Sequence, residues 1–178
     1  MTCIFIKNTI QMNNYTFKKI SSSVNINSSI ENIWDKITNV EIENFKFPWY
    51  FRLLNIPKPI RAKILKEGVG GKRMAFFDNK KTFTQEIVTW EKHKTYSFTF
   101  NSEDTFKAGY FFNIFTGIFR ISKGTYYITT VEAQNQIELQ TDYMIKKGFN
   151  WILGKPIYLI LTVFQSYLLN TIKVTSEK

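Results

Sequence analysis

Only two side chains in this chain belong to the types that most often act as nucleophiles or proton shuttles. Cys3 is the single cysteine and His93 the single histidine among 178 residues. A disulfide framework or a cysteine–histidine zinc site needs more of these residues, and Cys3 lies at an N-terminus that we expect to be frayed. An enzyme that uses carboxylates, tyrosines or a bound cofactor remains open, as does a protein with no chemistry. We predict no metal and no cofactor.

The single histidine falls in a predicted turn between two strands. It is flanked by Lys92 and Lys94, whose charges disfavour an imidazolium, and no carboxylate is placed in sequence to orient the ring as a base. We interpret His93 as a solvated turn residue.

The segment Glu67-Gly-Val-Gly-Gly-Lys-Arg73 resembles a phosphate loop in composition. A P-loop needs a glycine five residues before Gly71 and a serine or threonine after Lys72, and Lys66 and Arg73 stand at those positions. Arg73 also occupies the place of the third glycine of the dinucleotide fingerprint. The spacing therefore favours a glycine-rich turn that enters a strand over a phosphate site.

The N-terminal third predicts a strand followed by a short helix. Residues 17–26 read as a strand, and Ser28 followed by Glu31 has the form of a capping box. Apolar residues at helical spacing follow, which indicates a helix with one apolar face. They are Ile30, Ile33, Trp34 and Ile37.

Residues 40–66 contain the aromatic run 45–51 and two closely spaced prolines, Pro57 and Pro59. Since proline fits neither a regular helix interior nor a central strand, we predict short helical turns joined by an irregular loop. This segment is expected to cover the core rather than form it.

The rest of the chain predicts antiparallel strands and then one long helix. The strands are expected at 72–77, 82–91, 95–100, 114–121 continuing through 125–131, and 137–146, joined by short turns. The helix is expected at 156–172, with Pro156 in its first turn. Residues 151–169 are apolar enough to raise the question of a membrane span, but Lys155, Pro156, Gln165 and Ser166 interrupt them. A helix gripped by a sheet explains the same composition.

The faces of the sheet follow from the hairpin turns, because paired residues point the same way. Two-residue turns at Asn79-Lys80 and Lys92-His93 would place Arg73 and Glu86 on the outer face as a surface ion pair. A three-residue turn at either hairpin would change this facing and could turn the pair inward. With two-residue turns, the covered face collects Met74, Phe76, Phe83, Gln85, Ile87, Tyr96, Phe98 and Phe100.

The pattern resembles the START-like helix-grip superfamily (SRPBCC), which includes polyketide cyclases/dehydrases and lipid-transport proteins. The resemblance covers residues 17 to 175 and is specific for fold but not for ligand. It is carried by segments 24–38, 67–73 and 83–91 and by the terminal helix. It implies an α+β fold in which a curved antiparallel sheet wraps around a long C-terminal helix, with two short helices after the first strand and an apolar cavity between sheet and helix. We expect an N-terminal extension at 1–16 and a single helix-grip domain at 17–178.

The function expected from this resemblance is the binding or transport of a hydrophobic small molecule such as a lipid, a fatty acid or an aromatic polyketide. Packing in the hydrophobic core explains the type of each candidate lining residue as well as contact with a ligand does. The candidates are Met74, Phe76, Phe83, Gln85, Ile87, Tyr96, Phe98, Phe100, Leu139, Thr141, Tyr143 and Tyr158. The alternative is a cyclase- or dehydrase-like enzyme, in which Tyr96 and Tyr143 donate hydrogen bonds to an enolate and Gln85 holds a carbonyl.

The charge of the chain bears on its partners. The net charge is +10, but only four of the 24 cationic residues are arginine, and arginine is the residue that recognises phosphates and bases best. We therefore expect no nucleic acid partner. Much of this charge lies in residues 58–81, which form a basic segment. One interpretation of this segment is a solvated lysine-rich face. The other is weak contact with an anionic membrane through Lys58, Arg61, Lys63 and Lys66. With one cysteine and no signal sequence, we predict a cytoplasmic protein.

Overall fold

A computed structural model describes residues 14–100, 107–109, 112–113, 117–131 and 134–178. Within these residues eight antiparallel strands form one sheet in the order β1-β10-β9-β6-β5-β4-β3-β2. The strands are β1 (Tyr15–Ile26), β2 (Val40–Glu41), β3 (Pro59–Lys66), β4 (Lys72–Phe77), β5 (Thr82–Glu91), β6 (Thr95–Phe100), β9 (Phe119–Val131) and β10 (Gln134–Lys146). Two further strands, β7 (Lys107–Ala108) and β8 (Phe112–Asn113), pair only with each other.

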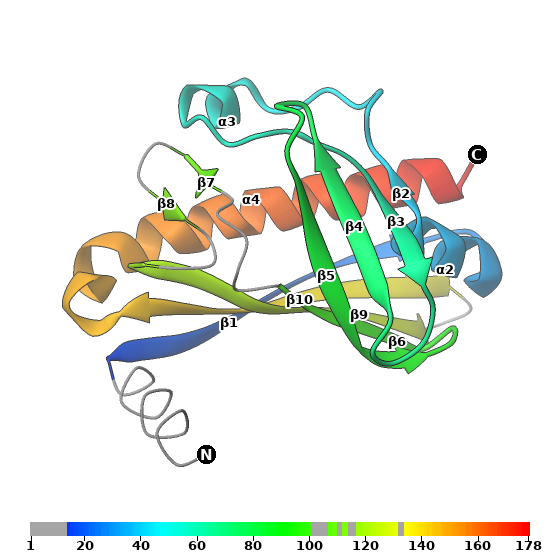
Figure 1. The fold of residues 1–178 in the computed structure, drawn as a ribbon. Coiled ribbons are helices and arrows are strands. Elements are labelled where there is room, and N and C mark those ends of the chain that lie inside the picture. The colour runs from blue at the N-terminus through cyan, green and yellow to red at the C-terminus, as the bar shows by residue number, and fades with distance from the viewer. Residues whose placement is uncertain (1–13, 101–106, 110–111, 114–116, 132–133) are drawn as a thin grey trace, which may run out of the picture.

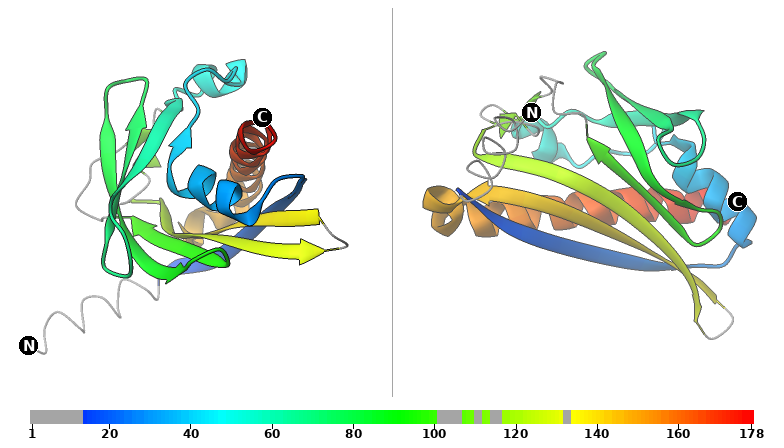
Figure 2. Two further views of the ribbon diagram at one scale, coloured as in Figure 1. Left: turned by 90° about the vertical axis from the view of Figure 1, so that its right-hand side faces the viewer. Right: turned by 60° about the horizontal axis from the view of Figure 1, so that its bottom comes forward.

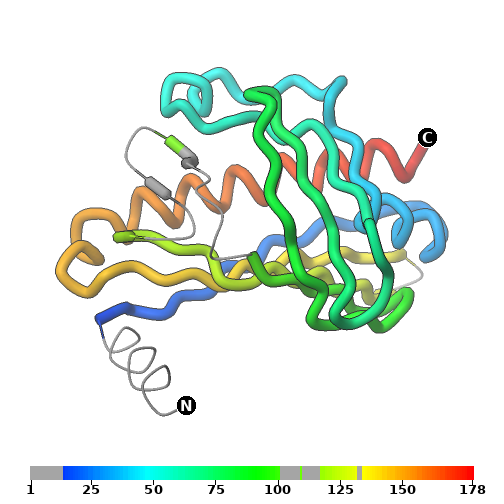
Figure 3. Tube along the Cα trace, in the orientation of Figure 1, coloured from blue at the N-terminus to red at the C-terminus, as the bar shows by residue number. Residues whose placement is uncertain are grey.

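The sheet curves around one long helix, α4 (Asn150–Ser176), as Figures 1 and 2 show from three directions. The Cα trace in Figure 3 shows that α4 runs the length of the molecule. The helix packs against β1, β10 and the short helix α2 (Ile30–Thr38). This arrangement confirms the expected helix-grip architecture. The proposed boundary between extension and domain stays a prediction, because residues 1–13 lie outside the described residues.

The C-terminal helix is longer than predicted. It begins at Asn150, directly after a single 3-10 turn at Lys147–Phe149, so Pro156 lies inside the helix and not in its first turn. The helix is long and apolar enough to cross a membrane by length and composition alone. Its buried residues face the sheet and α2, while other apolar side chains such as Trp151 (82% exposed) and Leu159 are exposed. The sheet therefore grips one face of this helix.

The α2 helix confirms the predicted apolar face but corrects its cap. Ser29, one residue later than expected, is the N-cap, and its hydroxyl accepts a hydrogen bond from the backbone N–H of Asn32 at 3.2 Å. Ser28 instead accepts from the side-chain amide of Asn32. Ile33, Trp34 and Ile37 are buried as predicted.

The segment from 40 to 66 is only partly irregular. A short helix, α3 (Trp49–Leu53), follows Pro48 as expected, but the residues from Pro59 onward form strand β3, which the prediction missed. Pro59 is the first residue of that strand, the position at which its missing N–H interrupts the ladder least. The prolines therefore delay the strand rather than prevent it.

Both hairpins around β5 contain a three-residue loop instead of the two-residue turn. At the β4–β5 hairpin Phe77 bonds to Lys81 across Asp78 to Lys80, and Lys80 takes a positive φ of 63°, as three-residue hairpin loops require at their last position. Arg73 is therefore opposite Gln85 and not Glu86, and every side chain of β4 exchanges faces relative to the prediction.

The β5–β6 hairpin has the same loop length but a compensating irregularity. Its pairing starts with Glu91 opposite Thr95, so Trp90, and not Thr89, lies opposite Tyr96. A register shift between Ile87 and Thr89 then restores the predicted partners, Ile87 with Phe98 and Gln85 with Phe100. An inserted residue in one strand offsets one residue of loop length.

Candidate functional site

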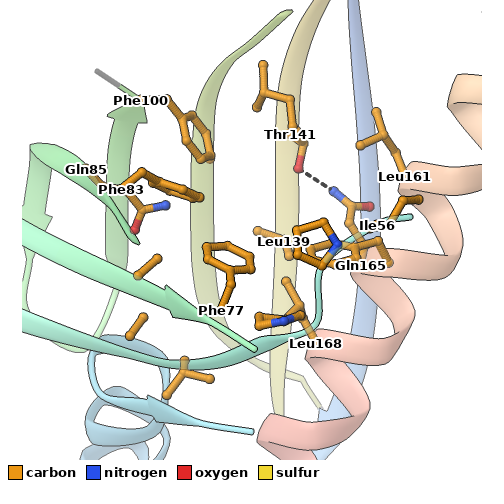
Figure 4. Close-up of a pocket in the computed structure, with 18 of the residues that line it drawn as sticks. Ile56, Phe77, Phe83, Gln85, Phe100, Leu139, Thr141, Leu161, Gln165 and Leu168 are labelled. Atoms are coloured by element: carbon orange, nitrogen blue, oxygen red, sulfur yellow. Dashed lines mark hydrogen bonds between the residues drawn. The ribbon is translucent and has the colours of Figure 1, made fainter. Parts of the chain in front are cut away.

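An apolar cavity lies between the concave face of the sheet and α4. Its volume is about 330 Å³, which is at the lower end of the range for small-molecule sites. Phenylalanine rings of β4, β5 and β6 enter from the strands, side chains of α4 close the opposite wall, and Ile56 lies beside them (Figure 4). Leu54 and Pro57 also line the cavity beside Ile56. The segment after α3 therefore covers the cavity, as the sequence predicted.

Half of the predicted lining residues do line this cavity. They come from β5, β6 and β10, and they are Phe83, Gln85, Phe98, Phe100, Leu139 and Thr141. Alternation along each strand was sufficient to find them, and the part of the β5–β6 pairing beside the cavity keeps its predicted partners. Their contact with a ligand stays a prediction.

The structure places the other six elsewhere. Met74 and Phe76 lie on the opposite face of β4 because of the three-residue loop, and the guanidinium carbon of Arg61 lies 4.5 Å from the centre of the Phe76 ring. Ile87 and Tyr96 are fully buried in the packed cluster around Trp34 and do not reach the cavity.

Tyr143 and Tyr158 line a separate, shallow depression together with Lys18, Lys19 and Lys155. Tyr158 of α4 is 49% exposed. Tyr96 and Tyr143, the proposed enolate donors, therefore share no cavity. The enzyme hypothesis stays a prediction.

The position of Arg73 differs from the prediction more than that of any other residue discussed at the site. The sequence placed it outside, beside Glu86, but the side chain is 4% exposed and lines the cavity. Its Nη1 donates to Gln85 Oε1 at 3.3 Å, and its Nη2 donates to the Ile37 carbonyl at 3.2 Å. Glu86 remains exposed opposite Lys72.

A buried glutamine joins α4 to the sheet at the cavity wall. Gln165 Nε2 donates to the Thr141 hydroxyl at 2.8 Å, the contact dashed in Figure 4, and to the Ile20 carbonyl at 3.4 Å. Its Oε1 accepts from the Ser22 hydroxyl at 2.9 Å. The sequence showed Gln165 as a polar interruption of the apolar helix but gave no partners, since these lie more than 20 residues away on β1 and β10.

Tyr126 on β9 is a cavity residue that the sequence analysis missed, although alternation along the strand would have found it. Burial raises its pKa from 10.0 to about 12, and the nearby positive charge of Arg73 opposes part of that rise. The phenol therefore stays protonated at neutral pH and can only donate or accept a hydrogen bond as a neutral group.

This pKa predicts a loss of stability in alkali. Because the folded pKa lies above the unfolded one, the stabilisation is complete below pH 10 and is lost as the pH rises through 10 to 12. At a pH of about 11, Tyr126 alone should remove about 1.4 kcal/mol from the free energy of unfolding. Urea unfolding of the wild type and Tyr126→Phe at successive pH values should show a shallower decline in the variant; parallel declines would contradict the assignment.

The glycine-rich segment forms the tight turn between β3 and β4, as predicted. Gly68 and Gly70 take positive φ angles of 84° and 77°. The turn is fixed to β5 by two backbone bonds, from Gly70 N–H to the Ile87 carbonyl and from Ile87 N–H to the Gly71 carbonyl. These backbone N–H and carbonyl groups of the turn therefore form hydrogen bonds within the sheet. The turn ends two residues before Arg73.

His93 lies in a turn with a positive φ of 67°, but it is half-buried rather than fully solvated. Its ring contacts Trp34 edge-on at 5.9 Å between centroids. The ring therefore packs against the end of the core.

Two of the four cations proposed for membrane contact have intramolecular partners. Lys58 Nζ donates to the Glu43 carbonyl, and Arg61 lies over the Phe76 ring. Lys63 and Lys66 are exposed on β3. Membrane contact stays a prediction.

No family model and no curated protein matches this chain, whereas solved structures do. Protein MLL2253 from Mesorhizobium loti superposes with a TM-score of 0.55 at 13% identity, over 89% of this chain and 96% of that one. Norcoclaurine synthase from Thalictrum flavum superposes with a TM-score of 0.54 at 16% identity, over 92% of this chain and 88% of that one. One such structure of the synthase holds dopamine and hydroxybenzaldehyde. At these identities the likeness shows the fold alone.

Proposed function

Since this chain has the helix-grip fold of the START-like superfamily, we propose that it binds a hydrophobic small molecule in the cavity between its sheet and α4. The single observation that carries the proposal is the cavity itself, whose walls are apolar apart from a few side chains. Apolar walls with a few placed polar groups are typical of small-molecule sites. The synthase complex with two small aromatic molecules supports the proposal by analogy of fold.

The cavity walls come from elements that are distant in the chain, which favours a preformed site. Ala75 and Phe77 of β4 share it with Leu161 and Leu168 of α4. Filling such a space with hydrocarbon removes apolar surface of both ligand and wall from water, at about 25 cal/mol for each Å². A ligand with a compact apolar body is therefore the expected occupant.

Blocking the cavity should abolish this binding. Ala75 lines the cavity and is 8% exposed, so the ring of Ala75→Phe would occupy the space of the ligand. We expect at least a tenfold (~1.4 kcal/mol) weaker affinity for a neutral apolar dye such as Nile red. Fluorescence titration measures this affinity, and native mass spectrometry with lipid extraction identifies any ligand carried from the cell.

The matched control is Met74→Phe, because Met74 is the neighbouring residue on the opposite face of the same strand. This variant should bind the dye like the wild type. Equal loss in both variants would indicate general damage to β4. A wild-type protein that is empty when purified and ignores the dye, fatty acids, sterols and aromatic polyketides would end the proposal.

A further inference from the structure

Arg73 is a buried cation with no counter-ion among the residues that the structure describes. Within the described residues no carboxylate forms an ion pair with it, and its Nε has no hydrogen-bond partner. The two bonds of its guanidinium go to neutral acceptors, Gln85 and the Ile37 carbonyl. The rings of Phe98 and Tyr96 lie 5.3 and 5.7 Å from its guanidinium carbon.

These neutral contacts leave the charge of Arg73 poorly compensated. A guanidinium stays charged at any pH that a folded protein experiences, so burial cannot neutralise it as it does a lysine. Burying a charge is costly unless it is paired, and hydrogen bonds to neutral groups at 3.2–3.3 Å are weaker than those to a carboxylate. Core packing alone would be served as well by an uncharged side chain.

Arg73 is positioned in the cavity wall, where its charge faces the space proposed for the ligand. Arg73 lines the cavity at the end nearest α2, since its Nη2 bonds to the Ile37 carbonyl of that helix. The other buried polar side chains of the wall already have partners. Gln85 accepts from Arg73, and Gln165 has its amide oxygen and nitrogen occupied by Ser22, Thr141 and Ile20. Arg61 also lines the cavity, but it is exposed and its guanidinium lies over the Phe76 ring. Among the described lining residues, Arg73 is therefore the buried cationic donor with an unsatisfied N–H.

We propose that the cavity selects a hydrophobic carboxylate, whose head group pairs with Arg73 while its apolar body fills the space towards α4. This inference rests on the proposed function and names the ligand class. A carboxylate matches the planar fork of a guanidinium and supplies one negative charge for one positive charge. A phosphate monoester, with a charge near −2, would leave a second charge buried without a partner.

The size of the cavity limits the body of this ligand. The cavity volume of about 330 Å³ lies at the lower end of the range for small-molecule sites. A medium-chain fatty acid or a small aromatic acid has that size.

The test compares decanoate with 1-decanol, two ligands that differ only in the head group, by displacement of Nile red at a pH of about 8. The wild type should bind decanoate at least tenfold more tightly than decanol. Arg73→Met should lose this preference and bind decanoate no more tightly than decanol, because the carboxylate would lack a partner. Its affinity for decanol should be kept, which also verifies that the variant is folded. Arg73→Lys should keep part of the preference, and Arg52→Met, which removes an exposed arginine outside the cavity, should keep all of it.

The outcomes separate this inference from the function on which it rests. Equal binding of decanoate and decanol by the wild type, or a preference unchanged in Arg73→Met, would overturn the carboxylate proposal and leave hydrophobic binding intact. If neither ligand displaces the dye and no dye binds, the proposed function fails and the inference fails with it. The wild-type comparison decides the question even if Arg73→Met does not fold.

Discussion

Replacing Gly71 with alanine is expected to lower the free energy of unfolding by roughly 3–5 kcal/mol, among the largest effects of a single substitution. A Cβ at this position would lie 2.1 Å from the Lys66 carbonyl oxygen and 2.7 Å from the Gly68 carbonyl oxygen. Both are backbone atoms, so no side-chain rotation relieves the overlap. Urea unfolding followed by tryptophan fluorescence measures the loss.

The turn has little freedom to adjust to the added methyl group. Gly71 N–H donates to the Gly68 carbonyl at 2.9 Å, and the Gly71 carbonyl accepts from Ile87 N–H at 2.9 Å. Moving the backbone would break one of these bonds. The control is Gly148→Ala, because nothing lies within 4 Å of a Cβ there and its φ is not positive. We expect that variant to stay within about 0.5 kcal/mol of the wild type; a similarly small effect at Gly71 would contradict the described turn.

The second large effect is expected for Gln165→Leu, which should destabilise the fold by about 2–4 kcal/mol. Leucine removes the amide that joins α4 to β1 and β10 and leaves the hydroxyls of Ser22 and Thr141 without this partner. A buried polar group that loses its partner retains the cost of its lost hydration. The change in the midpoint of urea unfolding measures the effect.

Ser166→Ala is the matched control for Gln165→Leu. Ser166 is the next residue on α4 and is exposed, and within the described part of the chain its hydroxyl bonds only to the Thr162 carbonyl of its own helix. Its loss should change stability by less than about 0.5 kcal/mol. If Gln165→Leu were as stable as this control, the glutamine would not hold the helix to the sheet.

Local pattern alone determined most of the elements of this protein. The strands at 72–77, 82–91 and 95–100 have the predicted bounds, and the apolar face of α2 was read from helical spacing. The glycine-rich turn was identified correctly because a phosphate loop needs particular residues at fixed offsets, and those residues are missing. These features depend on neighbours within a few residues, which the sequence displays directly.

Which side chains of β4 line the cavity depended on the length of the β4–β5 loop, and the sequence left that length open. A single additional residue in the β4–β5 loop moved Met74 and Phe76 out of the covered face and brought Arg73 into it. Six predicted lining residues nevertheless line the cavity, partly because the irregularity near Val88 cancels the longer β5–β6 loop.

Only the tertiary structure decided which polar groups share a space. The partners of Gln165 lie on β1 and β10, and those of Arg73 lie on α2 and β5. Tyr96 and Tyr143 were both inward by alternation, yet one lies in the cluster around Trp34 and the other at a separate depression. Alternation gives the face of a strand to which a side chain belongs, whereas the curvature of the sheet and the position of α4 determine which part of that face stays open.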